Sequence, residues 1–492
     1  MKFTAFAAAC LSLFSSSVAA DSNVSAPSSS KVTLPSTFKP PQVFKNANLV
    51  HIVSLEKNYA KEQINVLIEN TSPEPQDEYF IPFTSQQMEN VGGLEVKDRK
   101  DAELSGFVVE AVEFDSVSDV QFYRIRLPTP LAPKSQQTLG ISFYYLKSLS
   151  PLPSAIEQQD KQYLVYSFSA YCQSAYPTLK QKTEVKLPTS DIPEFTKIEG
   201  SGETKEFPAK QGSKLTYGPF PEVPAGAASP VKVRYEFTKP ITHVTELERD
   251  IEVSHWGGNV AFEERYTLFN YGANLSSQFN RVKWAQSQYF NPQTYALKEM
   301  KVPLRVGSKD AYFTDAIGNV STSRFRSNKR EAVLELKPRY PVFGGWKYPF
   351  TIGWNADSRR FLKSSGDQYL LNVPLVEGPK QPEGIEYEHV HVRVLLPEGA
   401  SNVKFYTNVP ESSITEHGVH LERTYLDTVG RTVLTIKARN LVDDFRDREL
   451  IVSYTYSTMA AFQKPLVIFA SMMAAFAGIW AISKVDVKFS TK

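Results

Sequence analysis

The chain has 492 residues, more than one hydrophobic core usually organises, so two domains are expected. Its 55 basic and 53 acidic residues leave a formal charge of +2, which excludes the strongly basic surface typical of nucleic-acid-binding proteins. The chain is therefore expected to form a large, near-neutral body with more than one core.

The first twenty residues have the pattern of a secretory signal peptide: one lysine, an apolar run, and small residues before position 21. Residues 21–40 are rich in Ser and Pro and predict a mobile segment. Cys10 lies within the signal peptide, so Cys172 is predicted to have no disulfide partner in the mature chain.

Strand patterns fill the region that follows. Runs such as QINVLIEN, HVHVRVLLP and LIVSYTY, separated by many of the 32 prolines, predict short strands and turns. Similar segments also recur in the same order, at sequence offsets that grow slowly along the chain. They pair Glu62 with Glu263, Tyr163 with Tyr369, Pro188 with Pro397, and Tyr235 with Tyr454. Each match alone could arise by chance in strand-rich sequence, but their shared order indicates a duplication.

We therefore predict an all-β fold made of two tandem duplicated β-sandwich-like luminal domains, followed by a single C-terminal transmembrane helix. The predicted domains span residues 41–238 and 239–458. A chain routed to the lumen exposes its Asn-X-Ser/Thr sequons to glycosylation, and the candidates are Asn70, Asn274 and Asn319. The sequon at Asn23 lies too close to the expected cleavage point to be counted.

The segment SHWGGNV, residues 254–260, stands out among the strands. Its two glycines predict a hairpin turn. The first copy has SLEKNYA at the corresponding place, and all tryptophans of the body lie in the second copy. They either fill a larger local core or form a surface that contacts a partner. The interface candidates are His255, Trp256, Trp346 and Trp354.

Catalytic and metal-binding motifs are not found. HExxH, GxSxG, GxGxxG, GxxxxGK[ST] and CxxC do not occur, so no cofactor and no independent enzyme activity are predicted. His389 and His391 share a strand face without an adjacent third ligand, which favours an exposed strand over a metal site. The alternating acids Glu246, Glu248, Asp250 and Glu252 favour a solvated outer face over a calcium site.

The run from Pro465 to Ile482 contains no charge and predicts one membrane-spanning helix in region 459–483. The signal peptide places the body in the lumen, and residues 484–492 then form a short cytosolic tail, as in a single-pass type I protein. Ala470, Ala474 and Gly478 are spaced by four and form a small-residue stripe. Such a stripe either lets a neighbouring helix approach closely or faces lipid.

Several motifs carry a resemblance to a known family. EVSHWGGNVAFEERYTL, DAIGNVSTSRF, PRYPVFGGWKYPFTIGWN and YLDTVGR closely resemble the ribophorin I family, the alpha subunit of the eukaryotic oligosaccharyltransferase. The resemblance covers the whole mature chain. The short tail resembles fungal members and lacks the cytosolic extension of animal members, so a ribosome-docking role associated with that extension does not follow here.

The resemblance implies a place in the endoplasmic-reticulum membrane complex that transfers a preassembled oligosaccharide from dolichyl pyrophosphate to Asn in Asn-X-Ser/Thr. The family's active site belongs to a different, multi-span subunit, and this chain has neither its WWD motif nor a DxD motif. The implied role is therefore non-catalytic: holding the complex together and guiding the acceptor polypeptide. Implied partners are the catalytic subunit, a small membrane subunit beside the helix, and the nascent polypeptide. The alternatives are a free-standing luminal receptor or chaperone, and a membrane-anchored hydrolase.

Overall fold

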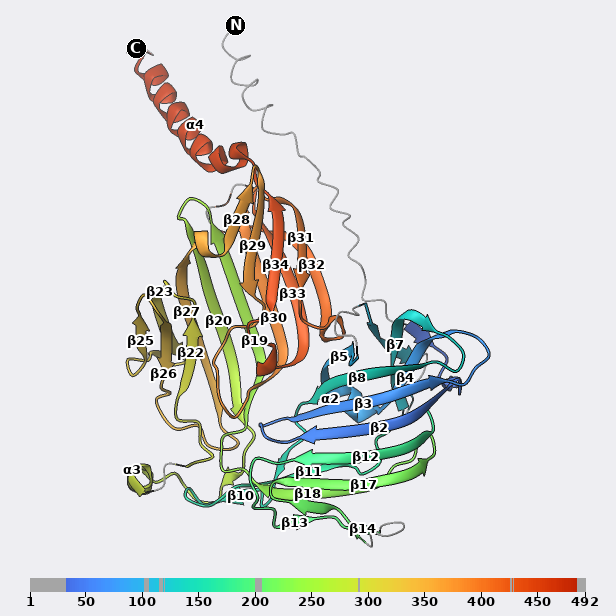
Figure 1. Cartoon of the computed structure of the whole chain (residues 1–492). Coiled ribbons are helices and arrows are strands. Elements are labelled where there is room, and N and C mark those ends of the chain that lie inside the picture. The colour runs from blue at the N-terminus through green and yellow to red at the C-terminus, as the bar shows by residue number, and fades with distance from the viewer. Residues whose placement is uncertain are drawn as a thin grey trace, which may run out of the picture.

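The computed structural model describes residues 32–100, 106–114, 118, 120–199, 206–290, 293–424, 427 and 429–484. The predicted signal peptide, residues 21–31 of the Ser/Pro-rich segment, and tail residues 485–492 lie outside this set. Within it the chain is built mainly from strands, with few helices, as the sequence predicts for an all-β protein (Figure 1). Residues Val32–Leu34 form a strand, so the prediction of a mobile segment over residues 21–40 is wrong for these three residues.

The first half of the chain contains three larger sheets. In spatial order, the seven-stranded sheet consists of β16 (Ala209–Gln211), β17 (Lys214–Val223), β12 (Thr178–Lys186), β2 (Phe44–Ser54), β3 (Ala60–Asn70), β8 (Gln136–Tyr145) and β5 (Val91–Asp98). One four-stranded sheet consists of β13 (Glu194–Phe195), β18 (Pro230–Glu236), β11 (Tyr163–Ser169) and β9 (Ser150–Pro151). The other consists of β1 (Val32–Leu34), β6 (Val108–Phe114), β7 (Val120–Leu131) and β4 (Gln76–Thr84).

The second half also contains three. The eight-stranded sheet consists of β24 (Gly318–Asn319), β23 (Lys309–Asp315), β27 (Lys347–Asp357), β20 (Asn259–Asn270), β19 (Thr242–Ser254), β30 (Glu386–Glu398), β33 (Arg431–Val442) and β32 (Ile414–Glu422). A four-stranded sheet consists of β28 (Leu362–Ser365), β29 (Gln368–Pro374), β34 (Glu449–Thr455) and β31 (Ser401–Thr407). A three-stranded sheet consists of β22 (Met300–Leu304), β26 (Ala332–Leu336) and β25 (Arg324–Ser327).

The remaining elements are short, apart from the last helix. Two strand pairs, β10 (Ala155–Ile156) with β21 (Asn274–Leu275) and β14 (Ile198–Glu199) with β15 (Glu206–Phe207), complete the sheets. Among the described residues the α-helices are α2 (Ser85–Asn90), α3 (Arg281–Phe290) and α4 (Thr458–Ser483), and the 3₁₀ turns are η1 (Ser358–Arg360), η2 (Glu411–Ser413) and η3 (Asp443–Phe445). Helix α4 is long and apolar enough to cross a membrane and extends from the end of the second half's strands (Figure 1).

The two largest sheets share a strand arrangement. The order β17-β12-β2-β3-β8 matches β33-β30-β19-β20-β27. In both sheets the two central strands, β2 and β3 or β19 and β20, form an antiparallel hairpin. The strand on the other side of β2 or β19, which is β12 or β30, runs parallel to it. The antiparallel pair β11–β18 likewise matches β29–β34. The residue pairs that indicate a duplication lie on, or directly after, strands that match in this way.

The predicted pairing of Glu62 with Glu263 is wrong, because the two residues lie on opposite faces of the matching strands. Glu62 is buried on the inward face of β3, whereas Glu263 lies on the outward face of β20. Side chains alternate along a strand, so a shift of one residue exchanges its two faces. Pairing Asn70 with Asn270 restores the match, because both are buried, end their strands, and accept a hydrogen bond from the main-chain N–H two residues on.

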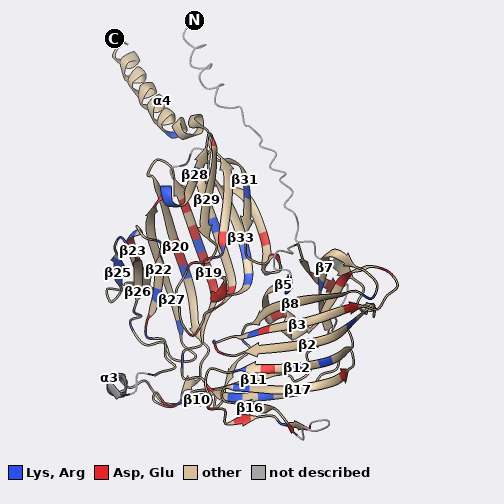
Figure 2. Cartoon of the chain, in the orientation of Figure 1, with Lys and Arg blue, Asp and Glu red and all other residues tan. Residues whose placement is uncertain are grey.

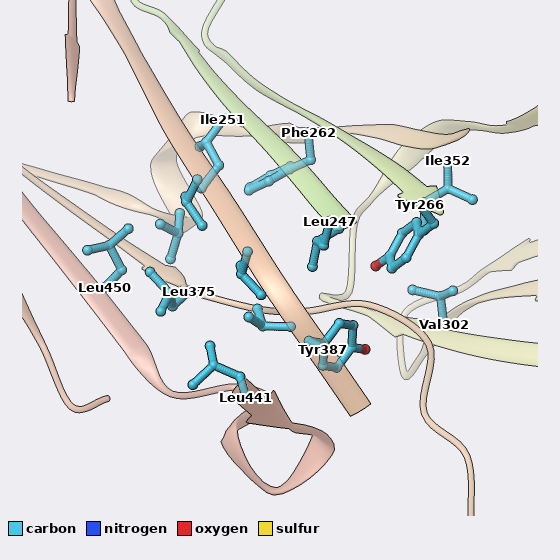
Figure 3. Close-up of a cluster of buried hydrophobic side chains, with 14 of the residues drawn as sticks. Leu247, Ile251, Phe262, Tyr266, Val302, Ile352, Leu375, Tyr387, Leu441 and Leu450 are labelled. Carbon is cyan, nitrogen blue, oxygen red and sulfur yellow. The ribbon is translucent and has the colours of Figure 1, made fainter. Parts of the chain in front are cut away.

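Most buried apolar residues of each half form a cluster of their own, and Tyr59, Tyr144 and Leu146 of the first half join the cluster of the second. In the second half, alternate residues of the long strands point into one cluster, in which Leu247, Ile251, Phe262 and Tyr266 face Leu375 and Leu450 (Figure 3). A separate cluster fills the first half. Along β3 and β20 buried and half-buried residues alternate without exception, as the two-residue period of a strand with one face on the core requires.

The hairpin that joins β2 to β3 attaches the first half to the second. The Lys57 ammonium lies 2.7 Å from both Asp443 and Asp444, and the Tyr59 hydroxyl donates to Asp443 at 2.7 Å. The side-chain amide of Asn58 donates to the main chain of Thr242. The segment SLEKNYA of the first copy is therefore a contact loop.

A buried histidine lies at the same boundary. His243 is hydrogen-bonded to Glu386 at 2.7 Å and to Glu388 at 3.1 Å, and Lys147 of the first half pairs with Glu388 at 2.6 Å. The ring stacks on Tyr271. Burial alone would lower the pKa of His243, but its two carboxylate partners outweigh burial and raise it.

Candidate functional site: the foot of the apolar helix

The segment SHWGGNV forms the turn between β19 and β20. The Ser254 hydroxyl accepts a hydrogen bond from the N–H of Gly257, and the N–H of Gly258 approaches the carbonyl of His255 at 3.3 Å. Gly258 has a φ of +58°, a conformation that a residue with a Cβ rarely adopts. The hairpin turn predicted from the two glycines is confirmed.

His255 fixes this turn to the neighbouring sheet. Its ring packs against Tyr369 and Tyr456, with centroid distances of 4.5 and 4.7 Å, and its Nε2 lies 2.8 Å from the Tyr454 hydroxyl. Burial lowers the pKa of His255, which favours the neutral ring. These contacts give His255 a positioning role in the turn.

Trp256 reaches from the turn to α4. Its indole N–H donates to the main-chain carbonyl of Ala461 at 2.9 Å, and its ring meets Phe462 edge-on. That carbonyl would normally accept a hydrogen bond from the N–H of residue 465, but Pro465 has none. Trp256 therefore supplies the donor that the proline removes from the helix.

An ion-pair cluster secures the same turn of the helix. Lys464 lies 2.6 Å from Asp427 and 3.3 Å from Glu398, two carboxylates that are nearly inaccessible to solvent. Burial alone would raise the pKa of Asp427, but hydrogen bonds from Lys464 and Thr424 outweigh it and lower that pKa to about 2. Asp427 is therefore charged at neutral pH and pairs with Lys464.

Packing and capping complete the junction. Ser457 caps α4 by accepting a hydrogen bond from the N–H of Ala460. Gly399, with a φ of +89°, has no room for a Cβ because the methyl group of Ala460 would lie 2.8 Å from it. A cavity of about 310 Å³, lined by Trp256, Lys464, Pro465 and their neighbours, remains between the turn and the helix.

The four interface candidates do not share one environment. Trp256 is the exposed member, at 67%, and His255 lies beside it. Trp346 is half-buried against Phe343, away from the junction. Trp354 is only 2% exposed and stacks on Phe262 inside the core, so its assignment to an interface is corrected.

The sequons also differ. Asn70 is completely buried, and its side-chain amide donates to the carbonyls of Glu74 and Leu131. An oligosaccharide cannot be attached there in the folded protein, so Asn70 is corrected from a glycosylation candidate to a strand-end cap. Asn274 and Asn319 are exposed, the latter in the tight hairpin of β23 and β24.

The acidic line on β19 lies on an ion-paired outer surface. Glu248 and Asp250 pair with Arg265, and Asp250 also pairs with Arg393 of β30. His389 on the neighbouring strand is exposed. Among the described residues no three His, Cys, Asp or Glu side chains are grouped so that they could hold a metal ion.

The small residues Ala470, Ala474 and Gly478 all lie on the exposed length of α4. Figure 2 shows this helix almost wholly without charge. The sequence reasoning did not identify Pro465, Lys464, Asp427 or Glu398 as junction residues. A proline directly after a lysine at the start of an apolar run is the signal that could have indicated them.

The two hairpin turns at matching places in the two largest sheets make equivalent contacts. The turn between β2 and β3 contacts the second half, and the turn between β19 and β20 contacts α4. Each turn thus joins its own half to the part of the chain that follows it.

Comparisons with known proteins agree over nearly the whole chain. The profile of the family Ribophorin I matches residues 44–483. A Schizosaccharomyces pombe protein is 31% identical over 445 residues, covering 89% of this chain and 96% of the relative. A Caenorhabditis elegans protein is 32% identical over 449 residues, covering 91% and 73%. Both relatives are named dolichyl-diphosphooligosaccharide–protein glycosyltransferase subunit 1. A subunit 1B of the same name from Arabidopsis thaliana is 28% identical over 468 residues, covering 93% and 96%.

Proposed function

The chain belongs to the ribophorin I family, and from this membership we propose that it is a non-catalytic subunit of the endoplasmic-reticulum oligosaccharyltransferase. In this role it supports transfer of a preassembled oligosaccharide from dolichyl pyrophosphate to Asn in Asn-X-Ser/Thr. The names of its relatives support this assignment. Helix α4 is the single membrane span, and the strand-built body lies in the lumen.

The observation that carries an assembly role is the junction at the foot of α4. Trp256, Lys464 and Gly399 join the helix to the second half by a hydrogen bond, an ion pair and close packing. A subunit that organises a membrane complex needs a fixed relation between its body and its span, because partners contact both. The exposed stripe of Ala470, Ala474 and Gly478 is where a small membrane subunit would pack.

The body is, in this proposal, a tandem duplication of a β-sandwich-like domain, with copies at 41–238 and 239–458. The shared strand order and the separate apolar cores support it. The multi-span catalytic subunit binds the body, which also guides the acceptor polypeptide.

Purification in mild detergent tests the function. We expect the chain to migrate with the multi-span transferase subunit. Migration alone would favour the alternative, a free-standing luminal receptor or chaperone for unfolded chains.

Variants refine the test. Trp256→Ala should lower the yield of intact complex and leave the strand-built body folded, because the ring is exposed and its bond is to α4. Trp354→Ala is the contrasting variant, since truncating a buried large aromatic costs about 3–5 kcal/mol of folding stability. Ile317→Ala, on an exposed loop, is the neutral control. An unchanged complex from Trp256→Ala would refute the assembly role of the junction.

A further inference from the structure

Two exposed tryptophans lie near the two ends of α4. Of the five tryptophans in the chain, Trp256 and Trp480 are strongly exposed, at 67% and 66%. Trp480 lies near the C-terminal end of α4, whereas Trp256 lies in the β19–β20 turn and is bonded to Ala461 near the beginning of the helix. Nineteen residues separate Ala461 from Trp480, which corresponds to about 28 Å of helix.

That separation fits a bilayer. The hydrocarbon core is about 30 Å thick, and tryptophans concentrate at the two interfaces that bound it. The apolar run begins at Pro465, and Ala461 lies about 6 Å before it along the axis. This is the depth of the headgroup layer, which adds roughly 5–8 Å on each side of the core.

The helix has no Trp or Tyr of its own at the position of Ala461 along its axis. The sequence from Thr458 to Leu466 contains no Trp or Tyr, so the β-turn supplies the indole at that level. The exposed side chains of Met459 and Phe462 continue the apolar surface beside the ring. An indole whose N–H is bonded to the protein and whose ring is about two-thirds exposed is suited to the boundary between lipid and water.

We propose that Trp256 is a membrane-interface anchor, whose ring contacts phospholipid in the leaflet on the side of the strand-built body. The occupant of this surface is lipid, because the surface is continuous with the apolar run of α4 at interfacial depth. The anchor rests on α4 as the membrane span and not on any partner subunit, so it is tested with the chain alone.

The experiment uses the full chain in phosphatidylcholine nanodiscs with all five tryptophans replaced by 5-fluorotryptophan. Resonances are assigned by Trp256→Phe, Trp480→Phe and Trp354→Phe. Phosphatidylcholine spin-labelled on its headgroup should broaden the fluorine signal of Trp256 as strongly as that of Trp480. The signal of Trp354, buried in the core, should stay sharp and serves as the internal control.

A water-soluble gadolinium chelate distinguishes the other outcomes. If it broadens Trp256 strongly and the spin-labelled lipid does not, the ring faces water and the proposal is wrong. If neither probe affects Trp256, protein covers the ring and the proposal is also wrong. Because no partner subunit is present, either failure leaves the proposed role in the transferase complex untouched.

Discussion

Replacing Gly92 by alanine should force the two halves of the body apart. Gly92 lies on β5 of the first half, against the left-handed residue Asn440 at the end of β33 in the second half. A Cβ at position 92 would lie 2.5 Å from the Cβ of Asn440 and closer still to its carbonyl oxygen. Real carbon contacts are never that short, so the alanine must open the boundary by about an ångström.

The magnitude follows from what lies at this contact. The Asn440 amide donates to the carbonyls of Glu89 at 2.7 Å and Val91 at 3.0 Å, and each such bond contributes about 0.5–1.5 kcal/mol. Overpacking a close contact adds about 1–3 kcal/mol. We therefore expect Gly92→Ala to destabilise the folded body by roughly 2–6 kcal/mol.

Urea unfolding of the full chain in mild detergent measures this loss, and small-angle scattering reports whether the halves separate. Gly418→Ala is the matched control, because it lies on β32 of the second half and a Cβ there meets no atom within 4 Å. Equal unfolding midpoints for the two variants, with unchanged scattering, would show that the boundary is not close-packed and refute the reasoning.

Three further predictions concern other parts of the chain. Asn319→Gln should remove one oligosaccharide, which would be seen as faster migration on a gel. Asn70→Gln should leave migration unchanged and lower the free energy of unfolding by about 1–3 kcal/mol, because the buried hydrogen bonds of Asn70 are lost. An oligosaccharide at residue 70 would contradict the prediction for Asn70. The raised pKa of His243 means that its stabilising effect is complete below about pH 6.5 and is lost as pH rises through the folded-state value. Unfolding free energy measured across pH 6–9 should therefore decrease with pH more steeply in the parent chain than in His243→Asn, and parallel curves would refute this. Pro465→Ala restores an N–H for the Ala461 carbonyl, so a double-mutant cycle with Trp256→Phe should show a coupling of about 1 kcal/mol, and strict additivity would contradict the proposed bond.

The two-residue period of the strands already predicts the burial of Trp354 and Asn70. Tyr348, Phe350, Ile352, Trp354 and Ala356 alternate along β27, and all five are buried. Trp354 therefore belongs to an inward face that the two-residue period already defines. The same reasoning applies to Asn70, which follows Ile64, Val66 and Ile68 on one face of β3. Both corrections could have been made from the sequence.

The junction could not have been predicted in this way. Trp256 and Ala461 are 205 residues apart, and a turn has no periodic pattern that indicates which way its side chains point. The glycines of the turn identify where the chain reverses, but the contact with α4 depends on how the second half's two main sheets bring β19, β34 and the helix together. Only the folded chain connects the carbonyl freed by Pro465 to an indole from another element.

The two matching hairpin turns connect the first half, the second half and α4 in series. The β2–β3 turn sets the orientation of the first half on the second, and the β19–β20 turn sets the orientation of the second half on α4. The contacts of these two turns therefore couple the tilt of α4 to the orientation of the second half, and the orientation of the second half to that of the first.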